Sequence, residues 1–210
     1  TLSSSSAASD VYKRQDYIWR MRSGFARGEF PMPSEAAKRT MQAVSRGDVP
    51  VVLGDYSDRP GDATWILKAL LKNNVSKLMY AALRDESALD ALKASGAKPG
   101  DKFDREVGGF SGEQAGTPVR ITGTVKYFGE GWGFDHIAVI EFGNQNVLFL
   151  VPTYVQIRTT DPLFIANLNP DDYDVFVVKS RVHFRRGFDE TGYAKTCLLY
   201  TSDAADEEDS

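Results

Sequence analysis

Short, almost uninterrupted apolar runs are the feature that most constrains the fold. Residues 51–53 and 175–178 contain only Val, Leu and Phe, and in residues 78–83 the hydroxyl of Tyr80 is the one polar side-chain group. Runs of this kind are typical of strands that a sheet buries on both faces. Each run is also as short as a strand rather than a membrane span, which needs roughly 18 consecutive apolar residues. The sequence therefore predicts a buried sheet and no membrane-spanning segment.

Helical patterns separate the first strands. Ser34 is a suitable N-cap for a helix whose apolar residues recur up to Val44, and Gly47 is suited to end it. Residues 66–71 supply the apolar stripe of a second helix, and a third helix is expected between Asp85 and Gly96. Because strands alternate with helices here, we expect parallel pairing with right-handed crossovers.

The middle of the chain has a different pattern. Residues 119–127, 136–142 and 147–152 are rich in β-branched and aromatic side chains, and the turn sequence 143–146 joins the last two. That turn predicts an antiparallel hairpin. We read the glycine-rich residues 129–133 as a turn, and residues 161–168 as a short helix. The expected fold class is α/β, with a mixed sheet made of a parallel βαβ part and an antiparallel hairpin, and with helices packed on it.

Both ends of the chain read as translated sequencing adapter. Residues 5–15 can be encoded by a transposase-end adapter, and the reverse complement of the same DNA, read one base in, encodes residues 197–207. Engineered ends are excluded from fold reasoning. We therefore expect residues 1–15 and 197–210 to be non-native. Residues 16–196 would form one domain, with 16–33 as a lead-in segment.

Excluding the end segments changes the charge balance. Of 25 basic and 29 acidic side chains, two basic and six acidic ones lie in those segments, which leaves 23 of each sign. A balanced surface has no overall field to recruit nucleic acid or an anionic membrane. We therefore expect neither as a partner. The single cysteine, Cys197, lies in the C-terminal segment, so residues 16–196 contain no thiol for a disulfide or a metal site.

Two loops contain candidate functional residues, because ligands of open α/β sheets bind beyond the carboxyl ends of the strands. In the first, residues 54–64, backbone N–H groups near Gly61 could face an anion. The alternative is that Asp62 caps the following helix and that Asp55 and Asp58 are solvated turn residues. We expect the two loops to border one pocket at one rim of the sheet.

The second loop, residues 179–185, follows the apolar run 175–178 and combines a hydroxyl, an imidazole and three cations. His183 could hold a substrate carboxylate or an oxyanion, or transfer a proton near neutral pH. It could equally be a structural histidine bonded to a carbonyl. His136, inside an apolar strand, is more typical of a structural histidine. With two histidines 47 positions apart and no His-Glu-x-x-His pattern, a complete zinc site within residues 16–196 is not expected.

Taken together, the two loops resemble a known family. The sequence Val-Val-Leu-Gly-Asp-Tyr-Ser-Asp-Arg-Pro-Gly-Asp-Ala-Thr at 51–64, Gly108-Gly109, and Lys-Ser-Arg-Val-His-Phe-Arg at 179–185 are similar to the C-terminal domain of the MlrC-type (microcystinase C) metallopeptidases. The likeness covers most of residues 16–196. The family commonly has Asp-Asn-Pro followed by a glycine-rich stretch, whereas Asp62 here follows Pro60-Gly61 directly.

The resemblance implies a bacterial, cytoplasmic zinc metallopeptidase or amidohydrolase of the microcystin-degradation type. Its zinc would be held mainly by a separate N-terminal domain in cis, where a zinc-bound water attacks a peptide or amide carbonyl of a small-molecule substrate. The C-terminal domain would form the substrate-facing wall, with no cofactor of its own. Matched positions make Ser180 and His183 the catalytic candidates. The substrate-binding candidates are Asp58, Gly61, Asp62, Lys179 and Arg185.

Two other interpretations remain open. The chain could be a stand-alone α/β module that binds a small anion or carboxylate through the same loops without catalysis. It could also use both loops only as helix caps and basic surface, in which case the loops should lie far apart. On the metallopeptidase interpretation, the chain by itself is expected to be catalytically inactive, because the metal-binding half is absent from it.

Overall fold

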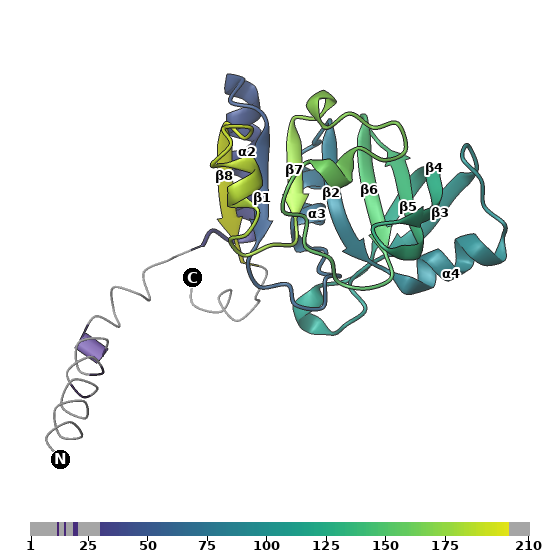
Figure 1. Ribbon diagram of the computed structural model, residues 1–210, viewed down its shortest axis with the longest axis horizontal. Helices are drawn as coiled ribbons and strands as arrows, with labels where there is room; N and C mark the ends of the chain where they lie inside the picture. The colour runs from purple at the N-terminus through teal and green to yellow at the C-terminus, as the bar shows by residue number, and fades with distance from the viewer. Residues whose placement is uncertain (1–11, 13–14, 16–18, 21–29, 202–210) are drawn as a thin grey trace, which may run out of the picture. The chain divides into compact units, whose positions relative to one another are not determined.

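Eight strands form one mixed sheet with the order β3-β4-β5-β6-β2-β7-β1-β8 (Figure 1). This computed structural model describes residues 12, 15, 19, 20 and 30–201. The strands are β1 (Val51–Asp55), β2 (Leu78–Arg84), β3 (Lys102–Val107), β4 (Val119–Gly131), β5 (Phe134–Phe142), β6 (Asn146–Val151), β7 (Val175–Val178) and β8 (Thr196–Tyr200). The predicted α/β class with a mixed sheet is confirmed. Most of the predicted lead-in, 16–33, and of the end segments lies outside the described residues.

The three apolar runs form the parallel part of the sheet. β7 lies between β1 and β2 and pairs with both in parallel, and β2 also pairs in parallel with β6. All residues of β1 and β7 are buried. Alternate side chains enter two separate cores, Leu53 and Val177 on one face and Val52 and Phe176 on the other. Burial on both faces explains why these strands are apolar without interruption.

The antiparallel part contains β3, β4, β5 and β6. The turn at 143–146 joins β5 to β6 with Phe142 opposite Asn146, as predicted. A tight turn at Trp132 and Gly133, both with positive φ, joins β4 to β5. β3 was not predicted, because only Phe103 and Val107 of its six residues are buried. An edge strand with four exposed side chains has no apolar pattern to reveal it.

Three helices, α2 (Pro33–Arg46), α3 (Trp65–Lys72) and α4 (Glu86–Ala94), cover one face of the sheet. A long loop segment with the short helix α5 (Arg185–Phe188) covers the other face. Buried residues of α2, α3 and α4 belong to the core that contains Leu53. Phe184 and Phe188, next to and within α5, belong to the core that contains Val52. The parallel strands therefore lie between two buried cores.

Several predicted helix ends are correct, and one is not. Gly47 ends α2 in the left-handed conformation, and the Asp85 carboxylate accepts the Ala88 N–H at the start of α4. Ser34 is not the N-cap of α2, because the helix already begins at Pro33 and Met32 precedes it as the cap. Proline is favoured at the first helical position, since its missing N–H would have no helical partner there.

The predicted helix at 161–168 is wrong beyond its first turn. A 3₁₀ turn covers Asp161–Leu163, and the chain then leaves helical geometry at Phe164. Ala166 and Asn167 both have positive φ, which an α-helix does not allow. None of the described helices is both long and apolar enough to cross a membrane.

The sheet ends at β8, which begins at the boundary expected between native and adapter-derived residues. β8 pairs in parallel with β1 from Val51–Thr196 to Asp55–Tyr200, and Tyr200 is fully buried. This strand was not predicted, because residues from 197 onward had been excluded as adapter-derived. The adapter origin of residues 197–210 stays a prediction, which resequencing of the source DNA tests.

Candidate functional site

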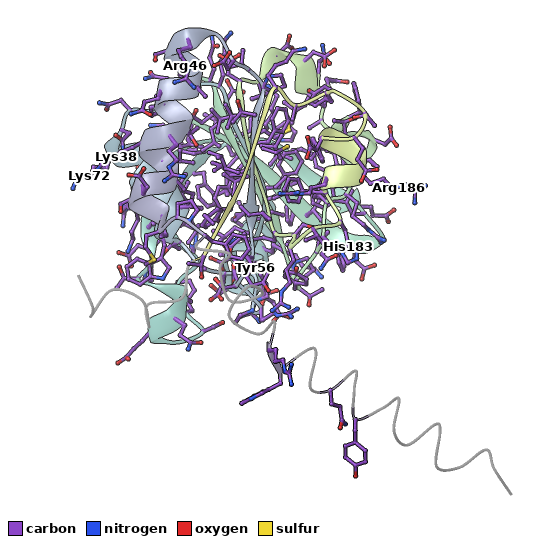
Figure 2. All side chains as sticks on the ribbon, turned by 90° about the vertical axis from the view of Figure 1, so that its left-hand side faces the viewer. Lys38, Arg46, Tyr56, Lys72, His183 and Arg186 are labelled. Carbon is purple, nitrogen blue, oxygen red and sulfur yellow. The ribbon has the colours of Figure 1, made fainter. Side chains whose placement is uncertain are left out.

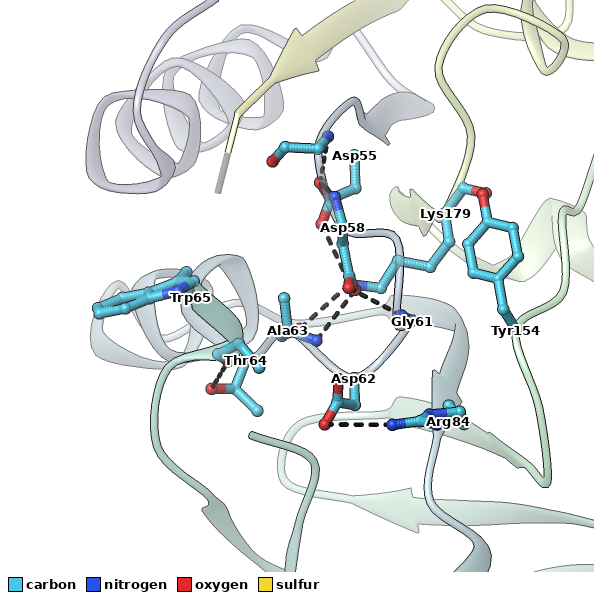
Figure 3. A network of polar contacts seen from close by, with 12 residues as sticks. Asp55, Asp58, Gly61, Asp62, Ala63, Thr64, Trp65, Arg84, Tyr154 and Lys179 are labelled. Carbon is cyan, nitrogen blue, oxygen red and sulfur yellow. Dashed lines mark hydrogen bonds and ion pairs between the residues drawn. The ribbon is translucent and has the colours of Figure 1, made fainter. Parts of the chain in front are cut away.

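The loop after β1, which we call the first rim loop (residues 55–64), is shaped by two aspartates. Asp55 Oδ1 accepts the N–H groups of Ser57 at 3.2 Å and Asp58 at 3.1 Å. Asp58 in turn accepts the N–H of Gly61 at 2.8 Å and that of Ala63 at 2.9 Å (Figure 3). Both carboxylates are buried. The suggestion that they are solvated turn residues is therefore wrong.

Lys179, the residue directly after β7, joins this loop to the second. Its Nζ lies 2.6 Å from Asp58 Oδ2, 3.1 Å from Asp55 Oδ2 and 3.1 Å from the Ala63 carbonyl oxygen (Figure 3). β1 and β7 are adjacent parallel strands, so both loops leave the same edge of the sheet. The predicted proximity of the two loops is confirmed, and the interpretation that they lie far apart is wrong.

The cluster keeps its charges although it is buried. Burial acts to raise the pKa of Asp58, but the Lys179 ammonium and the N–H groups of Gly61 and Ala63 outweigh it, so that this pKa is lowered. Burial acts to lower the pKa of Lys179, but the neighbouring Asp55 and Asp58 carboxylates outweigh it, so that this pKa is raised well above its ordinary value. Lys179 and Asp58 are consequently ionised at neutral pH.

Two tyrosines complete the surroundings of the cluster. The Tyr200 hydroxyl donates to Asp55 Oδ2 at 2.8 Å, and the Tyr80 hydroxyl donates to the Ala63 carbonyl at 3.1 Å. Burial raises the pKa of Tyr80 to about 12 and also raises that of Tyr200. Both hydroxyls are therefore protonated donors at neutral pH. The arrangement is suited to hold the first rim loop in one conformation.

Asp62 fixes a different loop. Its Oδ2 accepts the N–H groups of Phe110 at 3.0 Å and Ser111 at 2.9 Å, and Arg84 Nη2 lies 3.8 Å from the same oxygen (Figure 3). Asp62 Oδ1 is buried and has no hydrogen-bond partner among the described residues. The suggestion that Asp62 caps α3 is wrong, because Thr64 is the N-cap and makes no side-chain cap bond.

The Gly108-Gly109 pair has a packing role beside Asp62. The Gly109 N–H donates to the Asp62 carbonyl at 2.7 Å, and a Cβ on Gly109 would lie 2.5 Å from the carbonyl carbon of Thr117. Gly108 has φ of +61° and donates its N–H to the Asp85 carboxylate. Any side chain at position 109 would displace backbone, so the close approach requires glycine.

The second rim segment (residues 179–185) is buried at its start and exposed afterwards. Lys179 and Ser180 are 1% and 0% exposed, and Ser180 Oγ accepts the Phe184 N–H at 3.3 Å. His183 and Arg185 are exposed. In this structure Ser180 therefore positions the segment and does not face a cavity. Of the seven predicted site residues, His183 and Arg185 are the two that are exposed, since Asp58, Gly61 and Asp62 are also buried.

The two loops border separate cavities. Asp58 lines a cavity of about 100 Å³ together with Arg59 and Ser111. His183 lines one of about 580 Å³, which Arg185 does not line. The prediction of one common pocket is therefore not what these cavities show, although Tyr56 of the first loop and His183 lie at the same end of the molecule (Figure 2).

Sequence reasoning missed the four charged residues that line the larger cavity, Arg158, Asp161, Arg186 and Glu190. Arg186 follows Arg185 in the helix, and the sequence alone does not show which of the two faces the cavity. Arg158 is brought there by a close approach, since a Cβ on Gly187 would lie 2.1 Å from the Arg158 carbonyl oxygen.

The residues present do not fit a complete metal site. Within the described part of the chain, no group of three or more His, Cys, Asp and Glu side chains is placed to hold a metal ion. His136 stacks on Phe128 with ring centroids 5.1 Å apart, far along the chain from His183. The buried carboxylates Asp55 and Asp58 are instead bonded to Lys179.

Comparison with known proteins gives one family and one informative fold match. Residues 53–205 match the family described as MlrC C-terminus. A structure from Mesorhizobium sp. BNC1, provisionally assigned to the metallopeptidases, is similar with a TM-score of 0.66 at 15% identity. The match covers 88% of this chain and 39% of that one, so this chain spans about two-fifths of its neighbour's length. At this identity the likeness shows the fold alone. No curated protein sequence matches the chain.

Proposed function

Because the chain belongs to the MlrC C-terminus family, we propose that it is the C-terminal part of a metallopeptidase or amidohydrolase and forms the substrate-facing wall of its active-site cleft. The observation that carries this proposal is the ion pair between Lys179 and Asp58, with 2.6 Å between Nζ and Oδ2. It joins two loops at the carboxyl edge of adjacent parallel strands, where ligands of open α/β sheets bind.

The catalytic metal, expected to be zinc, would be bound by another domain. No group of described residues is placed to bind that metal. What these residues supply is a fixed rim, because Asp55, Asp58 and Lys179 hold one another in place. A positioned wall lowers the entropy lost when a substrate is oriented beside a reactive group.

His183 is the residue that we propose contacts the substrate. It is exposed, it lines the larger cavity, and its ring has no hydrogen bond or ion pair with any described residue. An imidazole in that state is free to steady a developing oxyanion or a substrate carboxylate. Ser180 acts as a positioning residue, since its buried hydroxyl accepts the Phe184 N–H and so sets the path of the chain around His183.

The test is His183→Ala in the full-length parent enzyme, recovered by reassembling the source DNA after adapter removal. We expect turnover of a peptide substrate to fall about 100-fold, the usual size for loss of one preorganised donor. Urea unfolding should change by no more than about 0.5 kcal/mol, because the side chain is exposed. Lys195→Ala, at an exposed position outside the cavity, is the matched control. Wild-type turnover in His183→Ala would remove this residue from the mechanism.

A binding module without catalysis remains the second candidate, and the exposed arginines beside His183 favour it. The upstream gene distinguishes the two. Continuation into a domain with Asp-x-His and further His or Glu ligands supports the enzyme, whereas a nearby start codon supports the module. For the enzyme we further expect the purified 210-residue chain to show no zinc-dependent peptide hydrolysis. Measurable hydrolysis by that chain would contradict the division of labour proposed here.

A further inference from the structure

A groove beside α5 has charged side chains of both signs. Its volume is about 580 Å³, and its charged or titratable lining residues are Arg158, Asp161, His183, Arg186 and Glu190. We call it the α5 groove. Val182, of which 52% is exposed, adds an aliphatic wall. The groove is several times larger than the cavity at Asp58, so it can admit a small molecule.

These charges do not neutralise one another. Among the described residues, the side chains of Arg158, Arg186 and Glu190 form no ion pair or hydrogen bond. The Asp161 carboxylate accepts one long hydrogen bond, 3.4 Å from the Thr159 hydroxyl. Guanidinium and carboxylate groups therefore face the same space without bonding each other. A ligand with both signs of charge would bond to both sets.

The backbone that carries these groups is held in place. Phe184 and Phe188 are fully buried on either side of the exposed residues, and they anchor α5 in the core. Gly187 lets the helix backbone approach the 158–159 backbone so closely that a Cβ would lie 2.1 Å from the Arg158 carbonyl oxygen. The Thr191 hydroxyl donates to the Gly187 carbonyl at 3.0 Å. The two walls of the groove are thus fixed relative to each other.

We propose that the α5 groove binds a ligand that carries both a carboxylate and an ammonium group, as a free amino acid or a short peptide does. Arg158 and Arg186 would bond the carboxylate, for which the guanidinium fork is well suited. Glu190 and Asp161 would accept the ammonium N–H groups. The proposal rests on the proposed function in that a peptidase meets such ligands as substrates or products.

The chain supplies its own control residue in Lys195. It is exposed and carries the same charge as Arg186, but it does not line the groove. Replacing Lys195 or Arg186 by Gln therefore removes the same charge, with only Arg186 facing the groove.

Titration of the full 210-residue chain, followed by NMR or calorimetry, tests the proposal. The probes are dialanine, N-acetyl-dialanine, which lacks the ammonium group, dialanine amide, which lacks the carboxylate, and alanine. We expect dialanine to bind, and each blocked form to bind about fivefold more weakly, the size of one solvent-exposed ion pair. Arg186→Gln should weaken dialanine binding about fivefold without weakening dialanine amide, and Lys195→Gln should change neither. Alanine compared with dialanine shows whether an amino acid suffices.

Equal binding of all four probes, or no binding of dialanine, would overturn the proposal. So would an equal loss in Lys195→Gln, which would indicate a general charge effect. Each variant is checked by circular dichroism, and Arg158→Gln replaces Arg186→Gln if that variant does not fold. These outcomes leave the proposed function intact, because turnover of the full-length parent with and without His183 tests it separately.

Discussion

The first rim loop and the segment that follows Lys179 leave the same edge of the sheet, yet their charged side chains differ in burial and in pairing. In the first rim loop the Asp55 and Asp58 carboxylates are buried, and every described bond that they make goes to backbone N–H groups, Lys179 or Tyr200. In the segment after β7, the charges from Arg185 to Glu190 are exposed and make no ion pairs with described residues. A loop with paired, buried charges and a segment with unpaired, exposed charges thus lie side by side.

The contrast between buried, paired charges and exposed, unpaired ones separates the groups that hold the fold from those available to a ligand. A buried charge is stable only with partners, so each group of the Lys179 cluster depends on the others. An exposed charge loses little when it stays unpaired, because water solvates it. Charge at the rim is therefore a guide to function only after burial has been taken into account.

The largest effect is expected from Lys179→Met. The change leaves the Asp55 and Asp58 carboxylates buried without their shared cation, and it should lower the free energy of unfolding by about 3–5 kcal/mol. Urea denaturation measures this. Lys195→Met, on an exposed lysine, is the control and should stay within about 0.5 kcal/mol of the wild type. Equal stability of the two variants would show that the cluster does not hold the first rim loop.

A smaller loss is expected from Asp62→Ala. The substitution removes the acceptor of the Phe110 and Ser111 N–H groups, and unsatisfied donors cost about 1–3 kcal/mol. Because no bond among the described residues joins the Asp62 side chain to Asp55, Asp58 or Lys179, the loss should add to that of Lys179→Met in the double variant. Thermal or urea unfolding of both single variants and the double variant decides this. Strong non-additivity would mean that the two networks act as one.

The smallest effect, and the sharpest test of the comparison, is the acid dependence of stability. The folded-state pKa of Asp58 is lowered, so its contribution is present above the unfolded value of about 3.9 and is lost as pH falls through the folded value. The free energy of unfolding of the wild type should fall below about pH 4, by at most about 1.4 kcal/mol per pH unit for this proton. Asp58→Asn should lack that component. An identical acid limb in both proteins would contradict the assigned pKa direction.

Much of the fold could be predicted because strands buried on both faces have uninterrupted apolar sequences. The runs at 51–53, 78–83 and 175–178 are apolar throughout, and all three form central parallel strands. β3 left no such record, since four of its six side chains face solvent. The segment 161–168, which was predicted as a helix, places Leu163 and Leu168 in the core that contains Val52, while Ala166 and Asn167 adopt positive φ.

The candidate site was predictable as a place more than as a set of contacts. The rule that ligands of open α/β sheets bind beyond the carboxyl ends of the strands put the loop near Gly61 and the one near His183 at one rim of the sheet. Which polar side chains point inward could not be read from the sequence, because Lys179 and Arg185 look alike there. Burial of Lys179 depends on the register of β7 against β1, and the role of Arg158 depends on a backbone approach from 29 positions away in sequence.

The position of β8 ties the end of the sheet to the chemistry of the rim. Its last residue, Tyr200, gives Asp55 a hydroxyl donor from a segment whose sequence we attribute to adapter DNA. Whatever residue a native continuation would place opposite Asp55 must offer a comparable proton, or that carboxylate would have one donor fewer inside the protein. The identity of a single edge residue would then tune how firmly the whole aspartate and lysine cluster is held.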